Sequence, residues 1–187
     1  SEHSKKVFKN TQFQKKGKDG ELQGNIKLEK PIEVLFEGVN LDIYKKVATK
    51  DNTIDLKAIP EQFAYLFLGH WMAGSLGHDR KNVGYMIKTF FETFKNQKNT
   101  PALILKASIG SASYISREEI LKRINNIKKT VNSSNLPNVY VLNGEMSDED
   151  INMLYNHPKV KAMVSLTKGE GFGRPLLEFS VTGKPII

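Results

Sequence analysis

The chain has no cysteine among its 187 residues, and it has no long uninterrupted apolar run. Without cysteine, a disulfide framework and a thiolate metal site are both excluded. A helix that crosses a membrane needs about 20 mainly apolar residues, and no apolar run here approaches about 18. The sequence therefore belongs neither to the small disulfide-rich scaffolds nor to the proteins with an apolar membrane-spanning helix.

The chain also lacks any arginine-rich tract and any aromatic signature of RNA binding. Its formal net charge is nevertheless +8, with a sequence pI of about 9.5, and the positive residues are spread along the chain. Such a charge is compatible with phosphorylated ligands, with an anionic membrane surface or simply with solvated lysines. Hydrophobic residues make up 39% of the chain, which is enough for a core in one domain or slightly more.

From residue 63 onward, short apolar runs alternate with amphipathic segments of helical period. Strands are predicted at residues 63–68, 102–105, 139–142 and 160–166, with a further one beginning at residue 184. Helices are predicted to begin at Asn82, at a capping box from Ser116, at a second capping box from Ser147, and beside Pro175. This alternation predicts an α/β fold, a Rossmann-like doubly wound parallel sheet with helices on both faces.

The N-terminal third gives a weaker pattern. Residues 1–13 are predicted to be helical, with Val7 and Phe8 as apolar contacts, and residues 14–24 to form a polar loop. Residues 31–36 are predicted to form a strand, and residues 40–60 give no clear signal.

A glycine-rich segment near the C-terminus is the most informative part of the chain. It runs from Lys168 to Glu178 and reads KGEGFGRPLLE. Gly171 and Gly173 allow the backbone to approach a ligand closely, and Pro175 suits the first turn of a helix. A helix start of this kind favours an anion such as phosphate, while Glu170 and Glu178 offer acceptors for hydroxyl groups. The segment therefore predicts a ligand that is part phosphate and part polyol, such as a nucleotide sugar.

Three informative loops, residues 69–81, 143–146 and 167–173, follow predicted parallel strands. In doubly wound sheets, ligands bind beyond the carboxyl ends of the strands. We therefore expect the three loops to converge on one ligand site.

Two other nucleotide-binding motifs are absent. A dinucleotide fold needs G-x-G-x-x-G after its first strand, but Gly69, Gly74 and Gly77 have a different spacing, and Lys106 follows the second strand where an acidic residue is needed. A P-loop needs Gly-Lys-Ser/Thr, which does not occur after Gly74. A non-catalytic α/β module that binds polyanions or nucleotides stays open as an alternative function.

The pattern Glu170-Gly-Phe-Gly-x-Pro-x-x-Glu178, together with Gly183-x-Pro185, resembles the E-x7-E segment of retaining glycosyltransferases of the GT-B fold, the glycosyl transferases group 1. The resemblance implies a remnant of the acceptor-side domain and a basic loop at residues 1–24. An interdomain segment at 25–60 and the nucleotide-sugar-binding domain at 61–187 would follow. Since the sequence stops inside a predicted strand, we expect this last domain to be incomplete.

The resemblance also implies roles for individual residues of the glycine-rich segment. Glu170 matches the carboxylate that contacts hydroxyls of the donor sugar, and Glu178 matches the one that holds the ribose. The backbone amides of Gly171, Phe172 and Gly173 match donors to the sugar or the diphosphate.

Cations for the diphosphate are expected in the loop after the first strand of the domain. Lys81 is similar to the lysine that clamps the diphosphate in this family. Most members have an arginine directly after the first-strand glycine, but here His70 occupies that position, and Arg80 is a second candidate for the same role. The nucleobase pocket is expected at Asn143, Gly144 and Glu145.

The function implied is transfer of a sugar from a UDP-, GDP- or ADP-sugar to a sugar, lipid-linked or protein acceptor in glycan or polysaccharide synthesis. The implied enzyme is a retaining hexosyltransferase. It needs no cofactor and no metal, and it does not bind nucleic acid. We expect a cytoplasmic location, and the basic charge could support contact with the inner face of a membrane. The 187-residue chain alone is expected to bind donor weakly without turnover.

Each candidate also has a simpler structural interpretation. Glu170 could be a solvated loop residue and Glu178 an exposed helix position. Lys81 and Arg80 could be surface charges before a helix, and His70 a packed or solvated loop residue.

Overall fold

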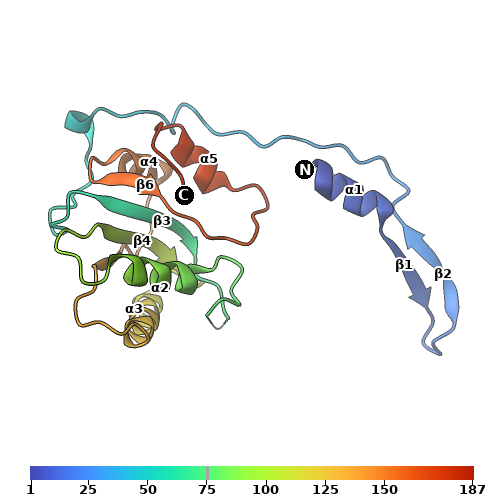
Figure 1. Cartoon of the computed structure of the whole chain (residues 1–187). Coiled ribbons are helices and arrows are strands. Elements are labelled where there is room, and N and C mark those ends of the chain that lie inside the picture. The colour runs from blue at the N-terminus through green and yellow to red at the C-terminus, as the bar shows by residue number, and fades with distance from the viewer. Residues whose placement is uncertain (75) are drawn as a thin grey trace. The chain divides into compact units, whose positions relative to one another are not determined.

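The computed structural model describes residues 1–74 and 76–187. Contacts within the chain define two compact units, Ser1–Gly38 and Val39–Ile187. The elements are numbered in chain order, and Figure 1 labels most of them. No helix among the described residues combines the length and the apolar character that crossing a membrane requires.

The first unit contains one helix and one antiparallel hairpin, so the predicted helix is shorter than expected and the predicted polar loop is wrong. Helix α1 spans Glu2–Asn10, and strands β1 (Gln12–Lys16) and β2 (Leu22–Lys27) follow it. Phe13 pairs with Ile26 across the hairpin, but every residue of both strands is exposed. Because a two-stranded ribbon without a buried face needs no alternation of apolar residues, the sequence pattern gave no strand signal.

The predicted strand at residues 31–36 is also wrong. These residues belong to no helix or strand, and the side chains of Leu35 and Phe36 are 94% and 84% exposed. An apolar run forms a strand only where a partner strand satisfies its backbone groups, and none pairs with this run among the described residues.

The second unit is built on four parallel strands in the order β5-β4-β3-β6. Their bounds are Ala64–His70 for β3, Ala102–Ser108 for β4, Val139–Val141 for β5 and Val160–Met163 for β6. A parallel bridge between Met163 and Ile186 adds the start of another strand beside β6, as the sequence predicts. The predicted run at 160–166 is longer than the observed strand, which ends at Met163.

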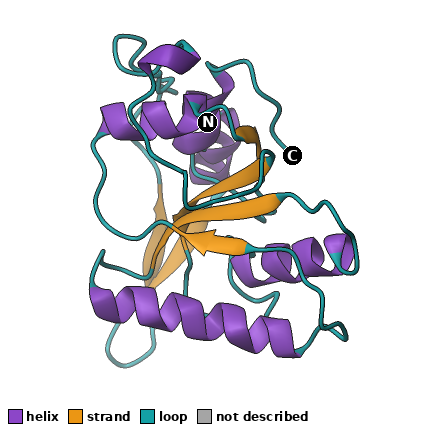
Figure 2. Cartoon of the chain, turned by 90° about the vertical axis from the view of Figure 1, so that its left-hand side faces the viewer, coloured by secondary structure: helices purple, strands orange, loops and turns teal. Residues whose placement is uncertain are grey.

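Helices lie on both faces of this sheet (Figure 2), which confirms the doubly wound fold. They are α2 (Val83–Phe94), α3 (Tyr114–Lys129), α4 (Asp148–Asn156) and α5 (Arg174–Ser180), with a short 3-10 helix η1 at Thr49–Asp51.

One face of the sheet packs on α2 and α3. Phe67 of β3 and Leu103 and Leu105 of β4 meet the buried faces of these helices. The helical period of the sequence predicts which residues of these two segments face inward. The prediction is confirmed for Val83, Ile87, Phe90 and Phe91 on α2 and for Ile120, Ile124 and Ile127 on α3. Phe94, also predicted to face inward, is only partly buried, and Val131 is buried but lies after the end of α3.

The other face packs on α4, α5 and residues from the segment 39–59. Alternate strand residues, Leu66 and Ile104, point to this side and meet Tyr155 and Phe179. Both strand faces are therefore buried, which explains why the central strands are continuously apolar in sequence.

Two helix starts differ in how well the sequence located them. Helix α4 begins with the predicted capping box, in which the Ser147 hydroxyl accepts from the Asp150 N–H. Helix α3 begins one turn earlier than predicted, because the Ser113 hydroxyl accepts from the Ser116 N–H and is the actual N-cap. Ser116 lies inside the helix and its hydroxyl donates to the Ile109 carbonyl.

The strand order determines where a ligand site can form. The chain runs from β3 to β4 to β5 in one direction and then returns to place β6 on the other side of β3. The loops after β3 and β6 therefore leave neighbouring strands at the point where the order reverses, which is the usual ligand position in such sheets.

A pair of isoleucines on α3 tests the packing of this unit. Ile120 is fully buried in the core and Ile115 is 80% exposed on the same helix. We expect Ile120→Ala to lower the free energy of unfolding by about 2–5 kcal/mol. Ile115→Ala should change it by less than about 0.5 kcal/mol. Urea unfolding of both variants measures the difference, and equal effects would contradict the observed packing.

Candidate functional site

The loops after β3 and β6 are joined by several hydrogen bonds at the carboxyl edge of the sheet. The Lys168 N–H donates to the Arg80 carbonyl at 3.0 Å, and the Arg80 guanidinium donates to the Gly169 carbonyl. The Lys168 ammonium donates to the Gly77 carbonyl. The two loops therefore hold each other in place at the point where the strand order reverses.

Glu170 is bound between two cations that come from the other loop. Its Oε1 accepts from the Lys81 ammonium at 2.5 Å, and its Oε2 lies 3.6 Å from the Arg80 guanidinium. The side chains of Glu170 and Lys81 are only 21% and 15% exposed. The interpretations of Glu170 as a solvated loop residue and of Lys81 as a surface charge are therefore wrong. The Arg80 side chain, in contrast, is about half exposed.

The pKa of the Glu170 carboxyl reflects this pairing. Burial alone raises the pKa, but the hydrogen bond from Lys81 and the positive charges of Lys81 and Arg80 outweigh that effect. The pKa of Glu170 therefore lies below its ordinary value, and Glu170 is ionised at neutral pH.

Lys81 is positioned by a buried carboxylate in the turn that precedes α2. Asp79 is 3% exposed and accepts from the backbone N–H groups of Lys81 at 2.8 Å and Val83 at 2.9 Å. Since these groups would otherwise be unpaired at the start of the helix, Asp79 fixes the backbone from which the Lys81 side chain extends.

Glu178 lies on α5 and is almost completely buried, at 3% exposure. Its carboxylate accepts from Nε of Arg174 at 2.7 Å and from the Tyr155 hydroxyl at 3.3 Å. Burial raises the pKa of Glu178, although the positive charge of Arg174 and the Tyr155 hydroxyl act in the opposite direction. The simpler interpretation of Glu178 as an exposed helix position is therefore wrong.

The arrangement separates the two predicted carboxylates. Glu170, Lys81 and Arg80 form one cluster, whereas Glu178 bonds to Arg174 and Tyr155. No hydrogen bond or ion pair within the described part of the chain links Glu178 to the Glu170 cluster. That both carboxylates flank one ligand stays a prediction.

The residues between the two glutamates form the tight turn that the sequence indicates. Gly173 has a φ of 82° and precedes the first residue of α5, and Pro175 lies in the first turn. A residue with a Cβ adopts this backbone conformation only at a cost, which explains the glycine. Gly171 is exposed, and Phe172 is 40% exposed.

A separate cavity of about 580 Å³ opens beyond the carboxyl ends of β3, β4 and β5. Its lining includes three predicted residues, His70, Gly144 and Glu145. His70 ends β3, and its Nδ1 lies 2.8 Å from the Ser108 hydroxyl at the end of β4. The structure thus brings His70 together with the two loop residues, although they are far apart in sequence.

Lys106 also lines this cavity, and it was not predicted as a site residue. Its ammonium donates to the Gly144 carbonyl at 2.5 Å. Burial lowers the pKa of Lys106, and the negative charge of Glu145 partly offsets this effect. The signal in the sequence was a lysine inside an otherwise apolar strand, where a charge is costly unless it has a specific partner.

Asn143 plays a supporting part in the same region. Its side-chain amide donates to the carbonyls of Ala112 and Ser113, at 3.3 and 3.2 Å. These bonds tie the loop after β5 to the start of α3. Asn143 therefore shapes the loop beside the cavity, while the neighbouring Gly144 and Glu145 line it.

The acidic pair Asp148 and Asp150 has a structural explanation. Asp150 completes the capping box of α4, and Asp148 lies 3.9 Å from the Arg174 guanidinium. Within residues 1–74 and 76–187, no group of three or more metal-ligating side chains comes close enough together to hold an ion.

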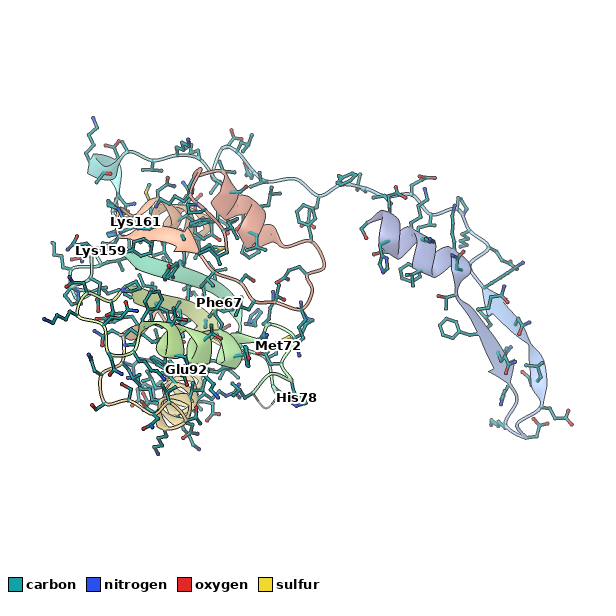
Figure 3. All side chains as sticks on the ribbon, viewed as in Figure 1. Phe67, Met72, His78, Glu92, Lys159 and Lys161 are labelled. Carbon is teal, nitrogen blue, oxygen red and sulfur yellow. The ribbon has the colours of Figure 1, made fainter. Side chains whose placement is uncertain are left out.

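The side-chain view orients these loops on the molecule. Figure 3 labels Met72 and His78 on the loop after β3, at the opposite end of the sheet from Lys159 just before β6. All the loops described above leave the sheet at the Met72 end, since every strand of the sheet is parallel.

The fold is similar to that of a solved glycosyltransferase domain. That structure is the 1.35 Å crystal structure of the C-terminal domain of a glycosyl transferase group 1 family protein, LpcC, from Francisella tularensis. The TM-score is 0.51 at 15% sequence identity, over 80% of this chain and 69% of that chain. At this identity, the likeness shows a shared Rossmann-like fold.

No protein-family model matches the sequence, and no curated protein matches it. The fold class predicted from the sequence is confirmed by the sheet order and by this likeness. The roles of the individual site residues stay predictions.

The ion pair between Lys81 and Glu170 predicts a shift in the pKa of Glu170 that NMR can measure. A carboxyl whose pKa is lowered in the folded state stabilises the fold above its ordinary pKa of 4.5, and this stabilisation is lost as the pH falls. We expect Lys81→Met to raise the pKa of Glu170, observed by carboxyl ¹³C titration. The exposed Lys98 provides the control, because Lys98→Met should leave the Glu170 pKa unchanged. An unchanged pKa in Lys81→Met would show that the pair does not form in solution.

Proposed function

We propose that the chain is the donor-binding part of a retaining glycosyltransferase, which moves a sugar from a nucleoside-diphosphate sugar to an acceptor. The observation that carries the proposal is the cluster of Lys81, Arg80 and Glu170 at the point where the strand order reverses. The similar fold of a glycosyl transferase group 1 domain and the E-x7-E pattern support it.

The cations suit the charge that develops when the bond to the sugar breaks. The leaving group is a nucleoside diphosphate, and its new negative charge needs fixed positive groups in a site with restricted water. Lys81 has a side chain 15% exposed and is held on a rigid turn by Asp79. Arg80 is held through the Gly169 carbonyl. Removing one such preorganised group typically costs about 3 kcal/mol of transition-state stabilisation.

Glu170 provides the acceptor that a sugar ring requires. Its carboxylate is ionised, and it lies beside the two cations that would bind the diphosphate. A diphosphate and a sugar hydroxyl are adjacent in a nucleotide sugar, so one cluster can orient both. Orientation of the sugar against a held leaving group is a large source of rate enhancement.

Glu178 would hold the ribose hydroxyls, as the resemblance implies. In this structure its carboxylate is occupied by Arg174 and Tyr155. The Arg174 side chain is 58% exposed, whereas the Glu178 side chain is 4% exposed. Because an unpaired buried carboxylate is costly, the ribose hydroxyls would have to replace the hydrogen bond from Arg174 as that side chain moves away.

The remaining parts of the proposal come from the resemblance alone. They are retention of the anomeric configuration, a hexose as the transferred group, an acceptor in glycan or polysaccharide synthesis, and a cytoplasmic location with contact at the inner membrane face. The acceptor side would be supplied by residues outside this chain.

Two substitutions test the proposed roles of the glutamates. We expect Glu170→Gln to weaken binding of nucleotide sugars about tenfold or more while leaving free nucleoside diphosphates bound. Glu178→Gln should weaken both classes of ligand, because both contain ribose. Ligand-observed NMR with a panel of nucleoside diphosphates and their sugars measures both effects, and Glu118→Gln on the exposed side of α3 is the control.

The alternative function gives a different result in the same experiment. A module that only binds polyanions would lose nothing in Glu170→Gln, since removal of a negative charge does not weaken anion binding. Unchanged or tighter binding of nucleotide sugars to this variant would therefore contradict the transferase proposal.

A further inference from the structure

The cavity beyond β3, β4 and β5 holds a cation and an anion that face the same space. Lys106 enters from the end of β4, and Glu145 enters from the loop after β5. The cavity measures about 580 Å³, which suits a ligand of the size of a nucleoside.

The two charges are near each other but are not paired. The negative charge of Glu145 acts on Lys106 strongly enough to affect the pKa of the lysine. No ion pair joins them among the residues that the structure describes. Because Lys106 and Glu145 line the same cavity without pairing, both are available to a ligand in it.

The Lys106 ammonium makes one hydrogen bond to the protein and has further N–H groups for a ligand. One of its three N–H groups is used by the Gly144 carbonyl at 2.5 Å. The ammonium is partly buried, so its remaining N–H groups gain from an acceptor on a ligand more than they would in water. Glu145 is exposed and accepts no hydrogen bond within the described residues.

The other walls of the cavity suit a flat ring. Gly69, Ala107, Gly110 and Ala112 contribute little side-chain bulk, and Met146 contributes an apolar, adaptable surface. A planar heterocycle with polar edges would fit such a space, with its edge directed at Lys106 and Glu145.

We infer that the base of the nucleotide donor is guanine, bound in this cavity where the family resemblance places the nucleobase, with Lys106 donating to the O6 carbonyl and Glu145 accepting from N1–H and the N2 amino group. This inference rests on the proposed function, and it names the class of donor as a GDP-sugar.

Guanine matches the two side chains better than uracil or adenine does. It presents one carbonyl beside two N–H donors, so the ammonium gains an acceptor and both carboxylate oxygens gain a donor. Uracil offers a single N–H between two carbonyls, which satisfies one carboxylate oxygen only. Adenine has no carbonyl, and its N6 amino group, which lies between the ring acceptors N1 and N7, is its only donor group.

The first experiment compares nucleoside diphosphates on the unmodified 187-residue chain by calorimetry or ligand-observed NMR. We expect GDP to bind at least about tenfold more tightly than ADP or UDP. Inosine diphosphate, which keeps the carbonyl and N1–H but lacks the N2 amino group, should bind about tenfold more weakly than GDP.

Two variants then assign the contacts. Glu145→Ala should weaken GDP about tenfold or more and make GDP and inosine diphosphate bind equally, since the group that distinguishes them is gone. Lys106→Met should weaken both ligands to a similar extent and keep the preference for GDP over inosine diphosphate. Lys98→Met and Glu118→Gln, at exposed positions outside the cavity, are the controls and should change neither ligand.

The outcomes separate the inference from the proposed function. If the chain binds ADP or UDP as tightly as GDP, or if Glu145→Ala keeps the preference for GDP over inosine diphosphate, the guanine inference is wrong while a nucleotide-sugar transferase still stands. If no nucleoside diphosphate binds, the proposed function itself fails. Should Lys106→Met fold poorly, the inosine comparison and Glu145→Ala still decide the matter.

Discussion

The parallel sheet is the constraint on which the candidate site depends. Because β3, β4, β5 and β6 all run in one direction, their following loops meet at one edge, and the reversal of strand order places the loops after β3 and β6 side by side. Lys81 and Glu170, 89 residues apart in sequence, meet only for this reason. The buried carboxylate of Asp79 and the backbone bonds of Lys168 then fix the geometry of that meeting.

The sequence predicted the strands and helices of the second unit, which have buried faces, and missed the hairpin of the first unit, which has none. Apolar runs such as residues 102–105 and helical faces such as that of α3 carry a periodic signal, because burial dictates each residue. The hairpin of Phe13 and Ile26 has no buried face, so turn and backbone bonding alone determine it. The start of α3 was misplaced by one turn because Ser116 matches the capping-box pattern with Glu119, whereas the N-cap in the fold is Ser113, which does not match it.

The candidate site also combines residues that the sequence located with contacts that only the fold determines. Glu170, Lys81 and His70 could be found from motifs and from their position after strands, and the structure places each at the carboxyl edge of the sheet. That Glu178 is buried against Tyr155, and that Lys106 turns toward Gly144, depends on tertiary contacts which no local pattern encodes. When a charged residue is buried against particular partners, its role is indicated by the geometry of the fold more than by spacing in the sequence.

The position of Glu170 beside Lys81 and Arg80 has a consequence for the end of a catalytic cycle under the proposed function. A nucleotide sugar carries two negative charges on its diphosphate, and the free diphosphate that remains after transfer carries up to three. A fixed, ionised carboxylate 2.5 Å from the lysine repels the second species more than the first. The same side chain that orients the incoming sugar would thereby help to expel the spent nucleotide, and product inhibition would be weaker than the two cations alone would cause.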